Sequence, residues 1–199
     1  MDHLRIYFED VQDGGCQSNF LSQFATEDTQ GGICFNIVLK WLQLYCANNS
    51  QLAPNKVFRE LIKQPDTIHS ISVAQSAYQK EQIIHSDDTF VFRYGLGANL
   101  VKDSFDNPAN FAPTVMNFIQ RQNHHMMEIG LYFKEGGAHS IGIIVHNNRI
   151  YLYDPNVGVM SSDMNNMIAL LREIPKLYGE VFRHSQLSRG IITNIEYQL

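Results

Sequence analysis

Hydrophobic side chains in the first part of the chain recur at the spacing of helices. From 33 to 47 they lie three or four positions apart, which predicts a helix with a buried face. Pro54 stands where a first helical turn favours proline, so a second helix is expected from there until Pro65 ends it. The other predicted helices span 71–84, 108–122 (which must accommodate Pro113) and 163–178.

After about residue 128 the spacing changes from helical to alternating, which is typical of strands. Two predicted strands are separated only by Asn147-Asn148, and such a pair favours a tight hairpin turn. A helical first part followed by antiparallel strands predicts an α+β fold. The predicted strands span 4–8, 89–94, 129–134, 139–146, 149–154 and 191–197.

The composition is that of one globular domain. The chain has 199 residues, of which 44% are hydrophobic and 18% are charged. This apolar content is enough to bury a core and too high for a disordered protein. We expect a single domain over 1–199, with a catalytic core from about residue 26 to the end. The net charge is −5, so a nucleic-acid partner is not expected.

The cysteines and residues 1–10 indicate the cellular compartment in which the protein works. Three cysteines do not make a disulfide framework, which favours a reducing environment. Residues 1–10 contain no apolar core of a signal peptide, and no apolar run in the sequence is long enough to span a membrane. The sequence therefore predicts neither a secretory signal peptide nor an integral membrane segment.

Cys34 stands where a nucleophile would be placed. It follows Gly31-Gly32 and begins the first predicted helix. A helix N-terminus carries partial positive charge and unsatisfied N–H groups, which favour a thiolate over a thiol and can stabilise an oxyanion. The alternative is a small cysteine buried in the core. Cys46, near the other end of the same helix, is expected to be structural.

The predicted hairpin brings a histidine and an aspartate together. With a two-residue turn, Ile143 lies opposite Leu152, and His139 lies diagonal to Asp154 on the same sheet face. An unpaired carboxylate there would be costly, whereas a paired one orients the imidazole and supports its charge. The alternative is a His–Asp hydrogen bond without chemistry. We expect this apolar face to pack against the Cys34 helix.

Three motifs carry this chemistry: Gly31-Gly32-Ile33-Cys34 with Trp41-Leu42 on the same helix, Gly136-Gly137-Ala138-His139-Ser140-Ile141-Gly142, and Tyr153-Asp154-Pro155-Asn156-Val157-Gly158. In order and approximate spacing they resemble the motifs of the YopT/AvrPphB-type cysteine peptidases, over about 31–159. The resemblance implies a papain-like fold. It also implies that Cys34, His139 and Asp154 are the nucleophile, the general base and the orienting residue of a triad.

The remaining part of the predicted site is the oxyanion hole. In the family that the motifs resemble, a side-chain amide a few residues before the cysteine completes this hole. Gln30 is the candidate for that role here, with Thr29 as the next choice.

The predicted reaction is hydrolysis of a peptide bond in a protein substrate. The resemblance implies a bacterial effector that leaves the bacterium without a classical signal peptide and cuts a host protein in the host cytosol. The same triad would also serve deamidation, transglutamination or another acyl transfer, and a third hypothesis is an inert binding module of the same fold. No cofactor or metal is expected, because His124-His125 stand without a metal-binding motif. The oligomeric state stays open.

Overall fold

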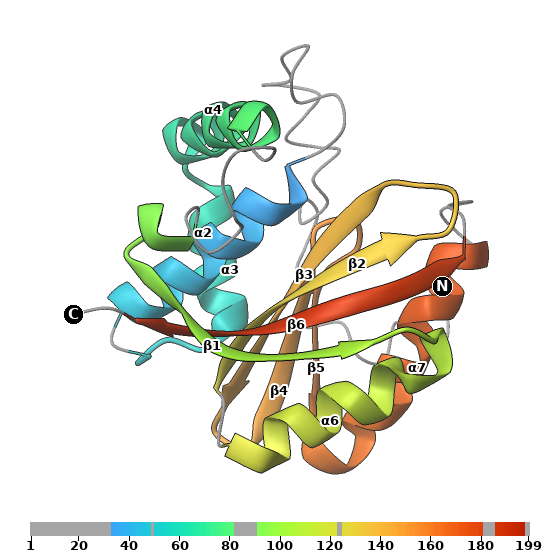
Figure 1. The fold of residues 1–199 in the computed structure, drawn as a ribbon. Helices are drawn as coiled ribbons and strands as arrows, with labels where there is room; N and C mark the ends of the chain where they lie inside the picture. Colours follow the sequence, from blue (N-terminus) through green and yellow to red (C-terminus); the bar gives the residue numbers. More distant parts are fainter. Residues whose placement is uncertain (1–32, 49, 82–90, 123–124, 181–185, 198–199) are drawn as a thin grey trace.

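The computed structural model describes residues 33–48, 50–81, 91–122, 125–180 and 186–197. Across these residues, a six-stranded antiparallel sheet lies between two groups of helices (Figure 1). Helices α2 to α4 cover one face of the sheet, and α6 and α7 cover the other. This is the α+β architecture that the sequence predicts. The extent of the catalytic domain stays a prediction, because the residues that the structure describes begin at 33.

The first helical layer is built around α2, the helix predicted over 33–47. Its residues Ile37, Trp41 and Leu42 have no exposed surface, because the sheet lies on one side of α2 while α3 and α4 lie on others. Trp41 Nε1 donates to the Pro54 carbonyl at 3.0 Å, which ties α2 to α3. The layer comprises α2 (Cys34–Ala47), α3 (Pro54–Ile62) and α4 (Pro65–Glu81), the last beginning earlier than predicted.

Four strands of the six-stranded sheet correspond to predicted ones: β2, β3, β4 and β6. The β3–β4 turn has Asn147 and Asn148 at φ of 49° and 61°, the positive values of a tight hairpin turn. Ile143 pairs with Leu152, so the predicted register is confirmed. The strand order is β1-β6-β2-β3-β4-β5. The strands are β1 (Leu96–Phe105), β2 (Met126–Phe133), β3 (Ala138–His146), β4 (Arg149–Asp154), β5 (Gly158–Asp163) and β6 (Leu187–Tyr197).

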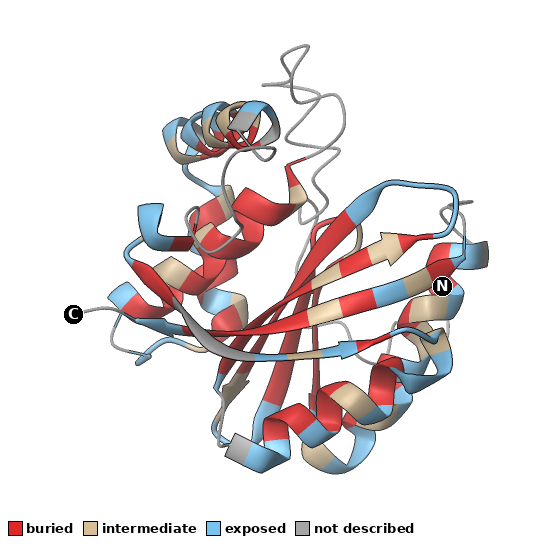
Figure 2. Cartoon of the chain, in the orientation of Figure 1, coloured by how far each residue is buried: buried red, intermediate tan, exposed pale blue. Residues whose placement is uncertain are grey.

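The second helical layer covers the other face of the sheet. It comprises η3 (Pro108–Asn110), α6 (Phe111–Gln122) and α7 (Met164–Glu180). Pro113 lies in the first turn of α6, where its missing N–H is not needed for the helix, so the predicted helix persists. Figure 2 shows buried residues where the helices meet the sheet and exposed residues on the outer sides of the helices.

Some elements differ from the sequence predictions. The sequence predicts neither β1, whose pairing with β6 shifts register between Ala98 and Lys102, nor β5, which buries consecutive residues instead of alternate ones. Residues 91–93 form a helical turn in place of the predicted strand, and Phe92 is exposed. The strand predicted over 4–8 lies outside the described residues.

The position of α2 corrects one expectation. The face of β3 and β4 that carries Ile143 and Leu152 packs against α6 and α7, not against the Cys34 helix. Helix α2 packs on the opposite face, where Ile144 and Tyr153 belong to its core cluster. The expectation was wrong because both faces of this hairpin are buried, and the tyrosines of β4 serve as core residues on the α2 side.

Gly142 allows α2 to approach β3 closely. A Cβ on Gly142 would lie 3.0 Å from Val38 Cγ1 and 3.1 Å from Trp41 Cζ3, which is closer than side-chain atoms ordinarily approach each other. Cys34 lies about one helical turn before Val38, and His139 lies on the same strand as Gly142. The close approach therefore helps to set the separation between Cys34 and His139.

We expect Gly142→Val to lower the free energy of unfolding by about 1–3 kcal/mol, because extra atoms in a filled core force side chains and backbone to shift. Urea unfolding would measure the change. Gly179→Ala is the matched control, since nothing lies within 4 Å of a Cβ there. Equal stability of the Gly142→Val variant and the wild type would contradict the close packing of α2 on β3.

Candidate active site

His139 lies near the start of β3, beyond the end of β4. Strand β3 begins at Ala138 and β4 ends at Asp154, and the pairing of the two strands stops at Gly142 and Tyr153. The edge of β3 beside His139 therefore extends past its neighbour. This arrangement places the imidazole where the end of a strand meets the two helical layers.

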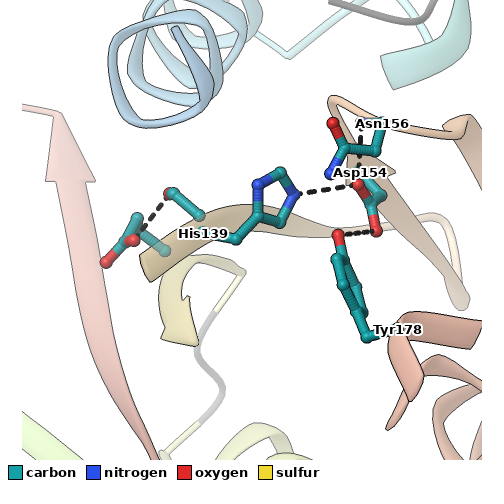
Figure 3. Close-up of polar contacts among 6 residues, drawn as sticks. His139, Asp154, Asn156 and Tyr178 are labelled. Carbon is teal, nitrogen blue, oxygen red and sulfur yellow. Dashed lines mark hydrogen bonds and ion pairs between the residues drawn. The ribbon is translucent and has the colours of Figure 1, made fainter. Parts of the chain in front are cut away.

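His139 and Asp154 form a buried pair. Nε2 of His139 lies 3.0 Å from Oδ1 of Asp154, and the exposed fractions of the two residues are 6% and 0%. This is the diagonal contact that the hairpin register predicts. Figure 3 shows the second ring nitrogen, Nδ1, on the side of the ring away from Asp154, so that Nδ1 is left for another partner.

The turn after β4 holds the Asp154 carboxylate through local contacts. The Asn156 N–H donates to Asp154 Oδ1 at 2.9 Å, and the Val157 N–H donates to the Asp154 carbonyl at 2.9 Å. Pro155 occupies the second position of this turn, where its fixed φ is favoured. The Asp-Pro-Asn sequence thus contributes local contacts that orient the carboxylate.

Tyr178 on α7 contacts the same carboxylate from the second helical layer. Its hydroxyl donates to Asp154 Oδ2 at 2.7 Å, and its ring centroid lies 5.3 Å from that of His139 (Figure 3). Sequence analysis did not identify Tyr178. The helical spacing over 163–178 predicts that a residue here is buried, but only the folded chain brings its hydroxyl to a carboxylate 24 positions earlier.

Cys34 is the first residue of α2 and is partly exposed. The residue before it, Ile33, is the N-cap and provides no side-chain cap bond. One N–H of the first turn, that of Asn36, is bound by Gln75 Oε1 at 3.3 Å. The thiol therefore sits at the positive end of the helix macrodipole, in the position that the sequence predicts.

Both Asp154 and Cys34 affect the pKa of His139. Burial alone would lower the pKa of His139, because the imidazolium loses hydration. The Asp154 carboxylate and, after it, Cys34 raise the pKa through their charge and through hydrogen bonds. These attractions outweigh burial and raise the pKa of His139 to about 10. His139 is therefore an imidazolium at neutral pH.

Cys46 differs from Cys34 in its surroundings. It is buried near the C-terminal end of α2, with its Sγ 3.3 Å from Met126 Sδ. Burial raises the pKa of the Cys46 thiol to about 11, so this thiol is a poor nucleophile near neutral pH. Cys16 lies outside the described residues.

Other residues of the predicted site lie in parts of the chain that the structure does not describe. Gln30 and Thr29, the candidates for the oxyanion hole, and His124 all lie outside the described residues. Among the residues that are described, no group of three or more His, Cys, Asp and Glu side chains is arranged to hold a metal ion. Within the same ranges, no helix has both the length and the apolar character needed to cross a membrane.

Comparison with known proteins gives a relative in sequence and matches among solved structures. No protein-family model matches the chain. A protein of Bradyrhizobium diazoefficiens, named as a candidate YopT-like cysteine protease, is 25% identical over 164 residues. That match covers 74% of this chain and 58% of the relative, so the chain spans little more than half of the relative's length.

One structural match is the Pseudomonas avirulence protein AvrPphB. Its crystal structure matches this chain with a TM-score of 0.67 at 14% sequence identity, covering 87% of this chain and 98% of AvrPphB. At this identity the likeness establishes the fold, which is the papain-like α+β fold that the motifs imply. Taken together, the sequence relative and the shared fold support the assignment of this chain to the YopT/AvrPphB-type cysteine peptidase family.

Proposed function

We propose that the chain is a cysteine peptidase in which Cys34 is the nucleophile, His139 is the general base and acid, and Asp154 orients the imidazole. The observation that carries this proposal is the buried His139–Asp154 pair, whose imidazolium is also stabilised by Cys34. A histidine held between a carboxylate and a thiol is the arrangement that activates a cysteine nucleophile. A purely structural His–Asp bond would not require the thiol.

In the proposed reaction the resting site holds a Cys34 thiolate and a His139 imidazolium. The sulfur attacks the carbonyl carbon of a peptide bond, a C–S bond forms, and the carbonyl oxygen takes the negative charge near the N-terminus of α2. His139 then gives its Nδ1 proton to the leaving amine as the C–N bond breaks. Water, deprotonated by His139, attacks the thioester, and the C–S bond breaks to release the carboxylic acid and the thiolate.

We further propose that the substrate is a host protein and that the enzyme is a secreted bacterial effector acting in the host cytosol. The support is the resemblance of the three motifs to the effector family and the shared fold with an avirulence protein. Neither the target protein nor the cleavage site follows from these observations.

A product analysis in host lysate tests the proposed reaction. Wild-type protein and the Cys34→Ala variant would be incubated with the lysate, and new N-termini and modified glutamines would be identified by mass spectrometry. Peptide hydrolysis predicts new N-termini with the wild type only. Modified glutamines without new termini would assign the triad to deamidation or transglutamination instead. The absence of any product that depends on Cys34 would contradict an enzyme and favour a binding role.

Alkylation rates test the nucleophile. We expect iodoacetamide to modify Cys34 at least about tenfold faster than Cys46 at pH 7, because reactivity follows the thiolate fraction and access. Time courses read by peptide mass spectrometry would give the rates for all three cysteines. His139→Ala should slow the labelling of Cys34 and leave Cys46 unchanged. Equal alkylation rates at the three cysteines would argue against Cys34 as the nucleophile.

Substitutions in the His–Asp pair should have unequal effects on activity. We expect His139→Ala to lower kcat/KM by roughly 100- to 10,000-fold, because the proton transfers are lost. Asp154→Asn should lower kcat/KM less, because Asp154 only orients and supports the imidazole. Asp66→Asn, an exposed change on α4, is the control and should match the wild type. A larger loss with Asp154→Asn than with His139→Ala would reverse the assigned roles.

The charge of His139 also predicts how stability depends on pH. The pKa in the folded protein is about 10, above an unfolded value of about 6.5. The stabilisation by the imidazolium is therefore complete below about pH 6.5 and is lost as the pH rises from there toward about 10.

Asp154→Asn removes the main attraction that raises this pKa. The stability advantage of the wild type over Asp154→Asn should therefore shrink as the pH rises through this window. Urea unfolding of both proteins between pH 6 and pH 10 would measure the advantage. A difference that stays constant with pH would show that His139 is not charged by Asp154.

A further inference from the structure

The two oxygens of the Asp154 carboxylate have different partners. Oδ1 accepts hydrogen bonds from His139 Nε2 and from the Asn156 N–H. Oδ2 accepts a hydrogen bond from the Tyr178 hydroxyl at 2.7 Å, shorter than either contact of Oδ1. Because Asp154 has no exposed surface, bulk water does not replace the Tyr178 hydroxyl if that donor to Oδ2 is lost.

The Tyr178 hydroxyl has a single proton, and its surroundings commit that proton to Asp154. Besides Asp154, the Asn156 side chain acts on this hydroxyl, and it lowers the pKa of Tyr178 through a hydrogen bond. The O–H of Tyr178 points at the Asp154 carboxylate, because the hydroxyl donates to Oδ2. Burial and the charge of Asp154 raise the pKa of Tyr178 well above its ordinary value, so the hydroxyl stays a donor.

The ring of Tyr178 adds a second effect. Tyr178 has no exposed surface, and its ring lies 5.3 Å from the His139 ring and 5.4 Å from the Phe133 ring, measured between centroids. The Tyr178 ring therefore lies against the His139 ring on the α7 side, and Phe133 packs behind it. A charged pair that is shielded from water interacts more strongly than an exposed one.

We propose that Tyr178 is a positioning residue for the reaction: its hydroxyl holds the Asp154 carboxylate in place, and Asp154 in turn keeps the His139 ring aimed at Cys34. This inference rests on the proposed function for its catalytic consequence, but the contact itself can be tested in the resting protein. Among the described residues, Asp154 on β4 and Cys34 on α2 raise the pKa of His139, and Tyr178 on α7 contacts its ring.

The first test measures the protonation of His139 without any substrate. In a Cys34→Ala background, NMR titration of the His139 ring would be compared with and without Tyr178→Phe, a change that removes the hydroxyl and keeps the ring. Tyr178→Phe should lower the pKa of His139 by about 1, because a less well-supported Asp154 attracts the imidazolium less. Asn156→Ala should lower the pKa of His139 by less than Tyr178→Phe does, since it leaves the Tyr178 hydroxyl in place.

Tyr45→Phe is the matched control. The Tyr45 hydroxyl is also hydrogen-bonded to a histidine, His146 Nδ1, at 3.0 Å, so the chemical change is the same at a different site. This control should leave the pKa of His139 unchanged. An unchanged pKa in folded Tyr178→Phe would overturn the proposal. Failure of both Tyr178→Phe and Asn156→Ala to fold would also overturn it, because the role would then be structural.

The second test uses the active protein. In the Cys34 wild-type background, Tyr178→Phe should lower kcat by about tenfold with little change in KM, and should move the alkaline limb of the kcat/KM profile to lower pH. A loss of kcat with an unmoved alkaline limb would contradict the proposal. If the NMR shift occurs but no variant or wild type cleaves protein, the contact stands and the proposed peptidase function fails.

Discussion

The proposed site depends on holding the Asp154 carboxylate in a place that water does not reach. Burial opposes the charge, and the protein compensates with a ring nitrogen of His139, a turn amide of Asn156 and the hydroxyl of Tyr178. The carboxylate in turn raises the pKa of His139 to about 10 together with Cys34. Without the Asp154 side chain, a buried imidazolium would have little to balance it, and His139 would be a weaker proton acceptor for the proposed nucleophile.

The fold delivers these groups from both faces of one sheet. Helix α2 crosses the first face at Gly142 and begins with Cys34, while α7 packs on the opposite face and supplies Tyr178. The two layers meet at Asp154 because β4 ends there, beside the start of β3. Core packing and chemistry are therefore coupled, since a shift of either helix relative to the sheet would change the surroundings of the same carboxylate.

Local rules account for what the sequence could predict here. The Asn147-Asn148 turn fixes the hairpin register, and the register alone brings His139 to Asp154. The sequence could not predict on which face of the β3–β4 hairpin α2 packs. Both faces of this hairpin are buried, and β4 uses tyrosines as core residues. Tyr178 could not be assigned a role, because helical spacing predicts burial but not the partner of a hydroxyl.

Trapping the acyl-enzyme tests the central claim most directly. The protein would be mixed with an activated peptide ester at mildly acidic pH, quenched in acid, and mapped by mass spectrometry for a thioester. The account predicts one acyl adduct, on Cys34, that is absent from Cys34→Ala and strongly reduced in His139→Ala. An adduct on another residue, or equal acylation of Cys34 with and without His139, would contradict it.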